Sequence, residues 1–491
     1  EEDMKQLKVL PLVAIISGLM VGCGGGGGGG GGSSTPRTTF TFTFAAPNVI
    51  SETNAQKDSC TIYDRRVDGN GIEQVLTYQP AVSAQLTGGK VVGFYSDKNG
   101  VRQGDFIYPS GTTLKFVLED IPEGGYFTYQ LLDASGTVFT ANSFSRDFLK
   151  DNNLRNSTFS MNREAVSTCN KNGNFRKATR TDLKYEATEA GGLEYNFISQ
   201  VAKESKPTYS IDSLDVRAVG SKLESTVVLQ YADTAKTELH QYGIRDWSSA
   251  SPLPLVGMNG SSPILNPTSF KYDSLDISVL VGDYNYEVAE LPMSTTKFYH
   301  PLEPKTETWT YSVSAEKPIN GWTVALNQKM YQDANWDISI DPSAYYNLNA
   351  LPASHVVTGS TIDTGFDFNE QDKGFSRVAY RAESNSGALH RVTHKIFTVL
   401  ESDIVVPELF YYTFDDNVKQ DLKVSSTSDY SQSVVVESAD ANLNSYDFVS
   451  LFSHGDVTDL KVDYDGLVIS EVDSEKVNTN AQKSDFMVLV K

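Results

Sequence analysis

The sequence predicts an all-β protein that contains several antiparallel β-sandwich domains behind a flexible glycine-rich segment. Three observations lead to this prediction. Residues 39–44 alternate strictly between threonine and phenylalanine, and short runs of β-branched and aromatic residues recur along the chain. Turn-forming residues separate these runs, and long amphipathic stretches are scarce. This pattern is typical of antiparallel sandwiches.

The first strand is predicted at residues 39–44, because a period of two places three phenylalanines on one face. Further strands are predicted at 91–95, 113–118, 126–132, 225–230, 276–281, 309–313, 391–400 and 433–437. Turns are predicted at 97–100, 123–125, 133–136 and 465–466. Two short helices are predicted at 146–154 and 193–203.

Polar and proline-rich segments predict three domains after the glycine-rich segment. A polar stretch at 170–181 ends the first domain (38–175), and Pro301 and Pro304 interrupt the strand pattern between the second (182–305) and the third region (306–491). Weak internal repeats leave one alternative, a divergent β-propeller over the C-terminal two-thirds.

The N-terminal segment has the layout of an export signal. Lys5 and Lys8 precede an apolar stretch at 9–21 that is too short to span a bilayer, and Gly22-Cys23 follows. This layout resembles the signal peptide of bacterial lipoproteins. The resemblance implies that residues 1–22 are removed, that the Cys23 sulfur receives a diacylglycerol, and that the new amino terminus is acylated. At ~0.8 kcal/mol for each buried CH₂, three acyl chains would anchor the protein permanently.

A flexible tether is predicted at 23–37. Its glycine run at 24–32 is followed by small and polar residues, which cannot bury apolar surface. In lipoproteins of this kind, an aspartate directly after the cysteine favours retention in the inner membrane. Gly24 stands at that position, so the resemblance implies the outer membrane.

Two cysteines remain once Cys23 is assigned to lipid. Cys60 and Cys169 in an exported protein predict one disulfide, and two buried free thiols are the alternative. The disulfide would close a loop of about 110 residues, worth roughly 4–5 kcal/mol in the chain-entropy model.

The net charge of −21 excludes a general affinity for nucleic acid, because phosphate binding needs basic patches. It also disfavours adsorption to anionic headgroups, so membrane attachment would depend on the lipid. High solubility is the simplest consequence of this charge.

The sequence carries no catalytic motif, and we expect neither an enzymatic activity nor a metal or cofactor. There is no Gly-x-Ser-x-Gly elbow, phosphate-binding loop or His-Glu-x-x-His. His390 and His394 lie in a predicted strand, where ~13 Å would separate them, so they could not share one ion.

Three tryptophans, Trp309, Trp322 and Trp336, form a cluster in the sequence. Exposed, they would form a stacking platform for sugars or a protein partner; buried, they would belong to a sandwich core.

Other resemblances are local. Residues 89–95 and 121–127 resemble the strand and turn of prealbumin-like and carboxypeptidase-regulatory-like sandwich domains. Residues 449–466 resemble the opening strands of a secreted bacterial β-domain family of unknown function. The leader and tether resemble those of flagellar-sheath lipoproteins of marine bacteria, which would imply a sheathed appendage.

The leading functional hypothesis is therefore a non-enzymatic lipoprotein anchored in the outer membrane, acting as a structural or adhesive component of the cell envelope or surface. Its expected partners are the membrane, through the N-terminal lipid, and envelope or surface proteins or glycans. The alternatives are a surface lipoprotein that binds or degrades polysaccharides and a periplasm-facing assembly factor.

Overall fold

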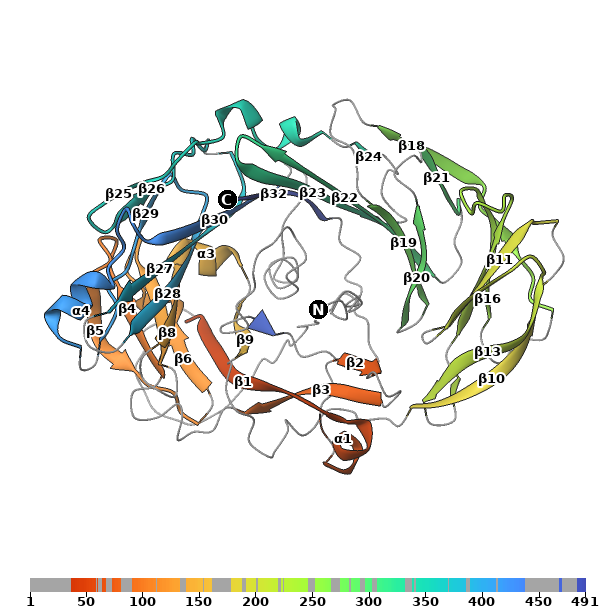
Figure 1. Ribbon diagram of the computed structural model, residues 1–491, viewed down its shortest axis with the longest axis horizontal. Coiled ribbons are helices and arrows are strands. Elements are labelled where there is room, and N and C mark those ends of the chain that lie inside the picture. The colour runs from red at the N-terminus through yellow and green to blue at the C-terminus, as the bar shows by residue number, and fades with distance from the viewer. Residues whose placement is uncertain are drawn as a thin grey trace, which may run out of the picture.

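The computed structural model describes residues 37–58, 60, 64–67, 73–80, 91–111, 113–132, 138–152, 154–160, 178–187, 191–199, 202–219, 222–223, 225–245, 252–265, 274–281, 284–291, 296–302, 307–331, 338–339, 341–369, 371–385, 389–411, 414–437, 468–469 and 484–491. The described residues form an all-β fold with short helices, as the sequence predicts. The strands lie around the periphery of the molecule in Figure 1.

The largest sheet contains twelve described strands and curves along the upper and left sides of Figure 1. In spatial order these are β20 (Tyr284–Leu291), β19 (Ser274–Val281), β22 (Thr308–Ile319), β23 (Trp322–Tyr331), β32 (Ser484–Val490), β30 (Asp429–Glu437), β27 (Gly374–Ser384), β28 (His390–Val399), β8 (Val138–Ser145), β7 (Tyr126–Leu132), β4 (Val91–Ser96) and β5 (Arg102–Ile107).

Two more sheets complete most of the fold. The first contains β2 (Asp64–Val67), β3 (Glu73–Pro80), β1 (Thr39–Ser51), β9 (Asn156–Ser160) and β31 (Val468–Ile469), with β6 (Thr113–Val117) also paired to β1. The second contains β12 (Lys203–Lys206), β11 (Glu194–Ile198), β15 (Thr226–Tyr231), β16 (Leu239–Arg245) and β17 (Val256–Gly257).

Three small sheets and several helices cover these layers. The sheets are β10 (Ala178–Glu186), β13 (Ser210–Val219) and β14 (Lys222–Leu223); β21 (Lys297–His300), β18 (Gly260–Leu265) and β24 (Ile338–Ser339); and β25 (Val356–Thr358), β26 (Thr361–Asp363) and β29 (Asp403–Val405). In the described part of the chain, the α-helices are α1 (Glu52–Asp58), α3 (Arg146–Asp151) and α4 (Asp416–Asp421), and 3₁₀ turns cover Leu118–Asp120, Pro342–Ala344 and Leu348–Ala350.

Strand alternation produces the core as predicted. Phe40, Phe42 and Phe44 all point from β1 into one apolar cluster, where they are at most 1% exposed. β15 is buried on both faces, because Val228 packs toward β13 while Val227 and Leu229 pack toward β19. The sheet that contains β15 is therefore the middle layer of this part of the molecule.

The hydrogen-bonded sheet passes across both expected domain boundaries. β19 pairs with β22 across the boundary at 305/306, and β8 pairs in parallel with β28, so strands of the expected first domain continue the sheet of the expected third region. The division into 38–175, 182–305 and 306–491, the leader at 1–22 and the tether at 23–37 stay predictions.

One of the two predicted helices is wrong. Residues 146–154 do begin with a helix, α3, whose N-cap Ser145 accepts a hydrogen bond from the Phe148 amide at 3.2 Å. Residues 193–203 instead contain β11 and the start of β12. Pairing of β11 with β15 buries Tyr195 and Phe197, and this tertiary gain overrides the weak helical pattern.

Candidate functional site

The point where the predicted tether meets the folded body is the candidate functional site. Here Arg37 forms an ion pair with Asp120, and the Thr38 amide donates a hydrogen bond to Glu119 Oε2 at 2.9 Å. The Leu118 amide donates to the Thr38 carbonyl at 3.0 Å. Residues 37–38 are therefore held to residues 118–120 by one ion pair and two hydrogen bonds. We call this group of residues the tether junction.

Strand pairing extends the tether junction into the sheet. β1 pairs antiparallel with β6 from Thr39↔Val117 to Thr43↔Thr113 and in parallel with β9 from Thr41↔Asn156 to Ala45↔Ser160. The Thr41 amide also donates to the Arg155 carbonyl at 2.6 Å. From Thr41 onward β1 is thus paired on both sides, so a force applied through the predicted tether would have to shear two strand pairs.

Aromatic packing holds the same strand from its apolar face. Phe40 stacks on Phe116 with ring centroids 5.0 Å apart, and Phe42 meets Phe116 edge-on at 4.9 Å. Phe44 lies edge-on to Tyr129 at 5.3 Å. Each buried aromatic ring of this kind contributes several kcal/mol to stability (roughly 3–5 when truncated to alanine). The strand that follows the predicted tether is therefore joined to one of the apolar cores within three residues of Arg37.

A surface cavity of about 340 Å³ lies beside the tether junction. Its lining combines apolar and charged residues: Thr38, Phe40, Leu118, Leu149, Lys150, Asp151, Asn152 and Arg155. Burial raises the pKa of the Asp151 carboxyl, which the neighbouring Lys150 partly offsets. Cations and an acid line the cavity together, so it does not present a field of one sign.

Among the described side chains, the arrangement that most resembles catalytic machinery lies in the twelve-stranded sheet, between β8 and β28. Ser143 Oγ and His394 Nε2 lie 2.7 Å apart, Thr128 Oγ1 lies 2.6 Å from Ser143 Oγ, and the Tyr380 hydroxyl lies 3.4 Å from His394 Nδ1. We call Thr128, Ser143, His394 and Tyr380 the buried polar chain.

The buried polar chain is built for structure rather than for nucleophilic attack. Thr128, Ser143 and His394 have no exposed surface, so a substrate could not reach the Ser143 hydroxyl. Burial lowers the pKa of His394 to about 3, which keeps the imidazole neutral. The second ring nitrogen faces a tyrosine instead of the carboxylate that orients the histidine in a hydrolytic triad.

A half-buried carboxylate lies at the end of the same strand pair. Glu401 follows β28, and Asp147 follows β8. Burial, and then the negative charge of Asp147, raise the pKa of Glu401 to about 7. The charge of Glu401 in turn adds to the burial that raises the pKa of Tyr126.

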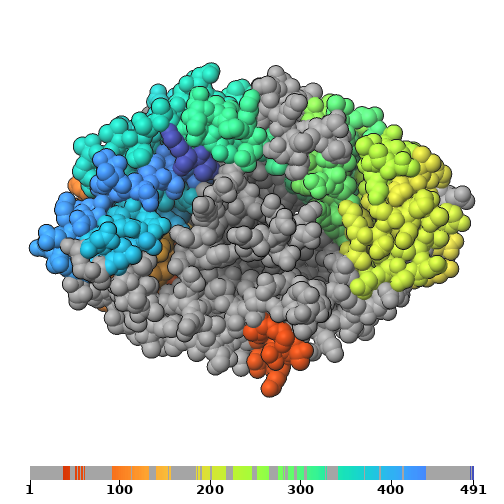
Figure 2. Space-filling model, viewed as in Figure 1, coloured from red at the N-terminus to blue at the C-terminus, as the bar shows by residue number. Residues whose placement is uncertain are grey.

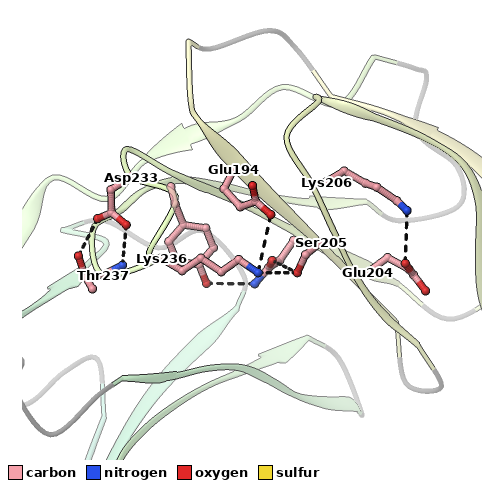
Figure 3. Close-up of polar contacts among 9 residues, drawn as sticks. Glu194, Glu204, Ser205, Lys206, Asp233, Lys236 and Thr237 are labelled. Carbon is pink, nitrogen blue, oxygen red and sulfur yellow. Dashed lines mark hydrogen bonds and ion pairs between the residues drawn. The ribbon is translucent and has the colours of Figure 1, made fainter.

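A second polar cluster lies on the five-stranded sheet, where the turn between β15 and β16 meets β11 and β12 (Figure 3). Lys236 Nζ donates to Ser205 Oγ at 2.6 Å and lies 3.8 Å from Glu194 Oε1. Ser205 Oγ donates to Asn196 Oδ1 at 2.7 Å, and Asn196 Nδ2 donates to the Tyr231 hydroxyl at 3.3 Å. A row of polar contacts therefore runs from the surface to a buried phenol.

The turn that carries Lys236 is held by its own side chains. Asp233 accepts hydrogen bonds from the Thr237 amide at 3.0 Å and from the Glu238 amide at 2.9 Å. Lys236 adopts a left-handed backbone with φ of 59°, which costs roughly 1–2 kcal/mol in a residue with a Cβ. The ion pair with Glu194 and the bond to Ser205 offset that strain, so this cluster closes a hairpin.

The structure places two of the three predicted tryptophans. Trp309 and Trp322 lie in an apolar core at 0% and 2% exposure, with Tyr345 and Tyr346 in the same core, while Trp336 lies outside the described residues. The indole of Trp309 packs edge-on against Tyr242 at 4.9 Å, and that of Trp322 packs edge-on against Phe366 at 5.0 Å. Neither indole offers a free face for stacking a sugar.

The predicted cysteines are placed only in part. Cys60 is buried and disulfide-bonded, with its amide donating to the Ala55 carbonyl at 3.0 Å. Cys169 and Cys23 lie outside the described residues, so the Cys60–Cys169 pairing and the lipidation of Cys23 stay predictions.

The histidine prediction is confirmed in its geometry. His390 and His394 both lie in β28, which is extended as expected. Within the described parts of the chain, no group of three or more histidine, cysteine, aspartate or glutamate side chains is placed to bind a metal ion. The same parts include no helix of the length and apolarity needed to cross a bilayer.

Sequence reasoning missed the tether junction and the buried polar chain. Glu119 and Asp120 follow a predicted strand and look like ordinary turn acids, with nothing to indicate Arg37 and Thr38 as their partners. Ser143 and His394 are 251 residues apart, and sequence spacing carries no signal for such a contact. Comparison with known proteins adds nothing to these assignments, because no family model, curated protein or solved structure matches the chain.

Proposed function

We propose that this protein is a non-enzymatic lipoprotein anchored in the outer membrane through Cys23, acting as a structural or adhesive component of the cell envelope or surface. The observation that carries the proposal is the tether junction. A segment with a lipoprotein-like leader and a glycine run leads into a strand that is clamped at Arg37 and Thr38 and packed through Phe40, Phe42 and Phe44.

Mechanical attachment explains this arrangement physically. A lipid anchor transmits force to the folded body through the first ordered residues. A glycine run behaves as a flexible coil, which lets the folded body take any orientation relative to the membrane. A force applied at residue 37 would act on β1, which is hydrogen-bonded to β6 and β9 and packed into a buried aromatic cluster. These contacts would keep β1 from being pulled out of the folded body.

The chemistry of the described interior supports a non-enzymatic role. The serine–histidine pair that most resembles a catalytic dyad is sealed from solvent, and the two described tryptophans are core residues. The proposed partners are the membrane and envelope or surface components, including those of a sheathed appendage.

The test is localisation of a Cys23→Ala variant. Lipidation by radiolabelled palmitate, membrane fractionation and protease shaving of intact cells would be compared with the unchanged protein. We expect the variant to lose the label and leave the membrane fraction, because its single attachment is removed. Shaving of the unchanged protein reports which face of the membrane the body occupies.

Gly24→Asp is the matched control, because it keeps Cys23 and the tether. We expect it to retain the palmitate label and to move from the outer to the inner membrane. A Cys23→Ala protein that fractionates with membranes as fully as the unchanged chain would refute the proposal.

A further inference from the structure

β32 is the strand that joins the two parts of the twelve-stranded sheet. It pairs antiparallel with β23 from Thr323↔Val490 to Lys329↔Ser484 and with β30 from Ser433↔Val490 to Glu437↔Phe486. Among the described strands, no other is hydrogen-bonded to both β23 and β30. In Figure 2 the dark blue atoms of this segment lie between green and lighter blue atoms from earlier parts of the chain.

The binding slot for β32 is apolar. Met487 and Leu489 are fully buried and belong to the same core as Val434 and Val436 of β30 and Val324 and Leu326 of β23. On the other face, Val490 packs with Val435 and Ala325. Without β32, two strand edges with unpaired amides and carbonyls and a strip of apolar surface would face solvent.

The chain between β30 and β32 is long for two neighbouring antiparallel strands. A hairpin of two to five residues is enough for such a pair, whereas residues 438–483 lie between these two. β31 ties part of this connection to β9, which leaves residues 470–483 between β31 and β32. Fourteen residues span up to about 50 Å when extended. That reach allows β32 to leave its own sheet.

We propose that β32 is an exchangeable strand and that the β23–β30 slot of one copy accepts β32 from a second copy of the same chain. The slot is filled by identical contacts whether β32 comes from the same chain or another, so the length of the connection and the local protein concentration decide between the two states. The exchange links copies without any additional binding surface. This inference goes beyond the anchoring role proposed above and does not rest on it.

The test uses cysteines that report whose strand fills the slot. The backbone of Lys491 exchanges two hydrogen bonds with Gln432, both 2.9 Å, so alternation makes Val435↔Val488 a non-hydrogen-bonded pair. The Cα atoms of such pairs are about 4.5 Å apart, within the range for a disulfide. Full-length chains carrying Val435→Cys and Val488→Cys, each with its own tag, would be co-expressed and purified in excess detergent micelles.

We expect a covalent heterodimer that contains both tags and a 435–488 linkage, identified by tandem purification without reductant and by disulfide mapping. The matched control co-expresses Ser314→Cys and Asn327→Cys, which face each other in the β22–β23 hairpin. A two-residue turn at Asn320-Gly321 joins these strands, so they should not exchange, and no heterodimer is expected.

A third chain carries Val435→Cys and Val488→Cys together. If this chain closes the 435–488 disulfide within itself while the co-expressed pair gives no heterodimer, β32 stays in its own sheet and the proposal is overturned. Failure to form the linkage in either arrangement overturns it as well, because β32 would then not lie beside β30.

Discussion

Two joints bring sequence-distant strands into the twelve-stranded sheet, and they are built from opposite kinds of side chain. The β8–β28 joint is a parallel pair that contains the buried polar chain, with Ser143 and His394 in direct contact. The β32 joint is antiparallel on both sides and buries Met487 and Leu489 among aliphatic residues. The first depends on particular polar partners, whereas the second depends on apolar area.

The polar joint therefore specifies which strands pair and in which register, whereas the apolar joint mainly contributes stability. A register slip at β8–β28 would leave buried hydroxyls and an imidazole without partners, which costs roughly 1–3 kcal/mol for each group. The apolar joint contributes more free energy but accepts any strand of the right pattern. We therefore expect the polar joint to fix one arrangement and the apolar joint to permit exchange.

At neutral pH, the largest effect is expected from Leu489→Ala in the apolar joint. Removing a fully buried leucine side chain should lower the free energy of unfolding by about 3 kcal/mol, through lost burial and the cavity left behind. Chemical denaturation of the full chain measures this loss. Val356→Ala is the control, because that valine is 55% exposed and should change stability by less than ~0.5 kcal/mol. Equal losses in the two variants would contradict the assignment of β32 to a core joint.

A smaller loss is expected from Ser143→Ala in the polar joint. The substitution removes the common partner of Thr128 and His394 and should lower the free energy of unfolding by about 2 kcal/mol. A double-mutant cycle with Thr128→Val should show a coupling above ~0.5 kcal/mol, because the two hydroxyls share one contact. Additive effects would mean that the buried polar chain does not act as a unit.

Acid should weaken the polar joint more than the apolar one. The folded-state pKa of His394 is about 3, below the ordinary value near 6.5, so the unfolded chain binds more protons between these pH values. Stability is therefore lost as pH falls from about 6.5 towards 3, by up to ~1.4 kcal/mol per pH unit. His394→Phe should flatten this part of the stability–pH curve relative to the unchanged protein. An unchanged slope in that variant would assign the acid sensitivity to other groups.

A pH effect of the opposite sign is expected at Glu401. Burial and Asp147 raise its pKa to about 7, so the folded protein holds a proton that the unfolded chain releases above about 4.3. Stability from this group falls as pH rises between these values. Glu401→Gln keeps the shape of the protonated carboxyl and should remove that decline in unfolding measurements between pH 5 and pH 7. A decline of the same size in the variant would show that Glu401 does not titrate in this way.

The nine strands predicted from local sequence patterns all fall on strands of the structure, because each pattern reflects side chains within a few residues. Val91, Tyr126 and the Thr-Phe alternation at 39–44 fall in β4, β7 and β1 as expected. The turn at 97–100 also holds, with Asp97 Oδ1 accepting the Asn99 amide at 2.9 Å and Gly100 at φ of 79°. These features need no information from distant parts of the chain.

The pairing of distant strands could not be predicted in the same way. Nothing in Val138–Ser145 indicates a partner at His390–Val399, because both read as ordinary half-buried strands. The ion pair between Arg37 and Asp120 could not be predicted from the sequence either, because exposed ion pairs have no characteristic sequence spacing. Some of the strands that carry the residues of the candidate site could therefore be predicted from the sequence, but the contacts between those residues could not.

The β8–β28 pairing also limits when the twelve-stranded sheet can form during synthesis. β8, near residue 140, emerges early in synthesis, yet its parallel partner β28 lies near residue 395 and emerges much later. Contacts of such large sequence separation form slowly and leave strand edges open in the meantime. Under the proposed export to the cell envelope, the chain would have to be kept from premature association until its last third arrives, and we would then expect its biogenesis to depend on a holding chaperone.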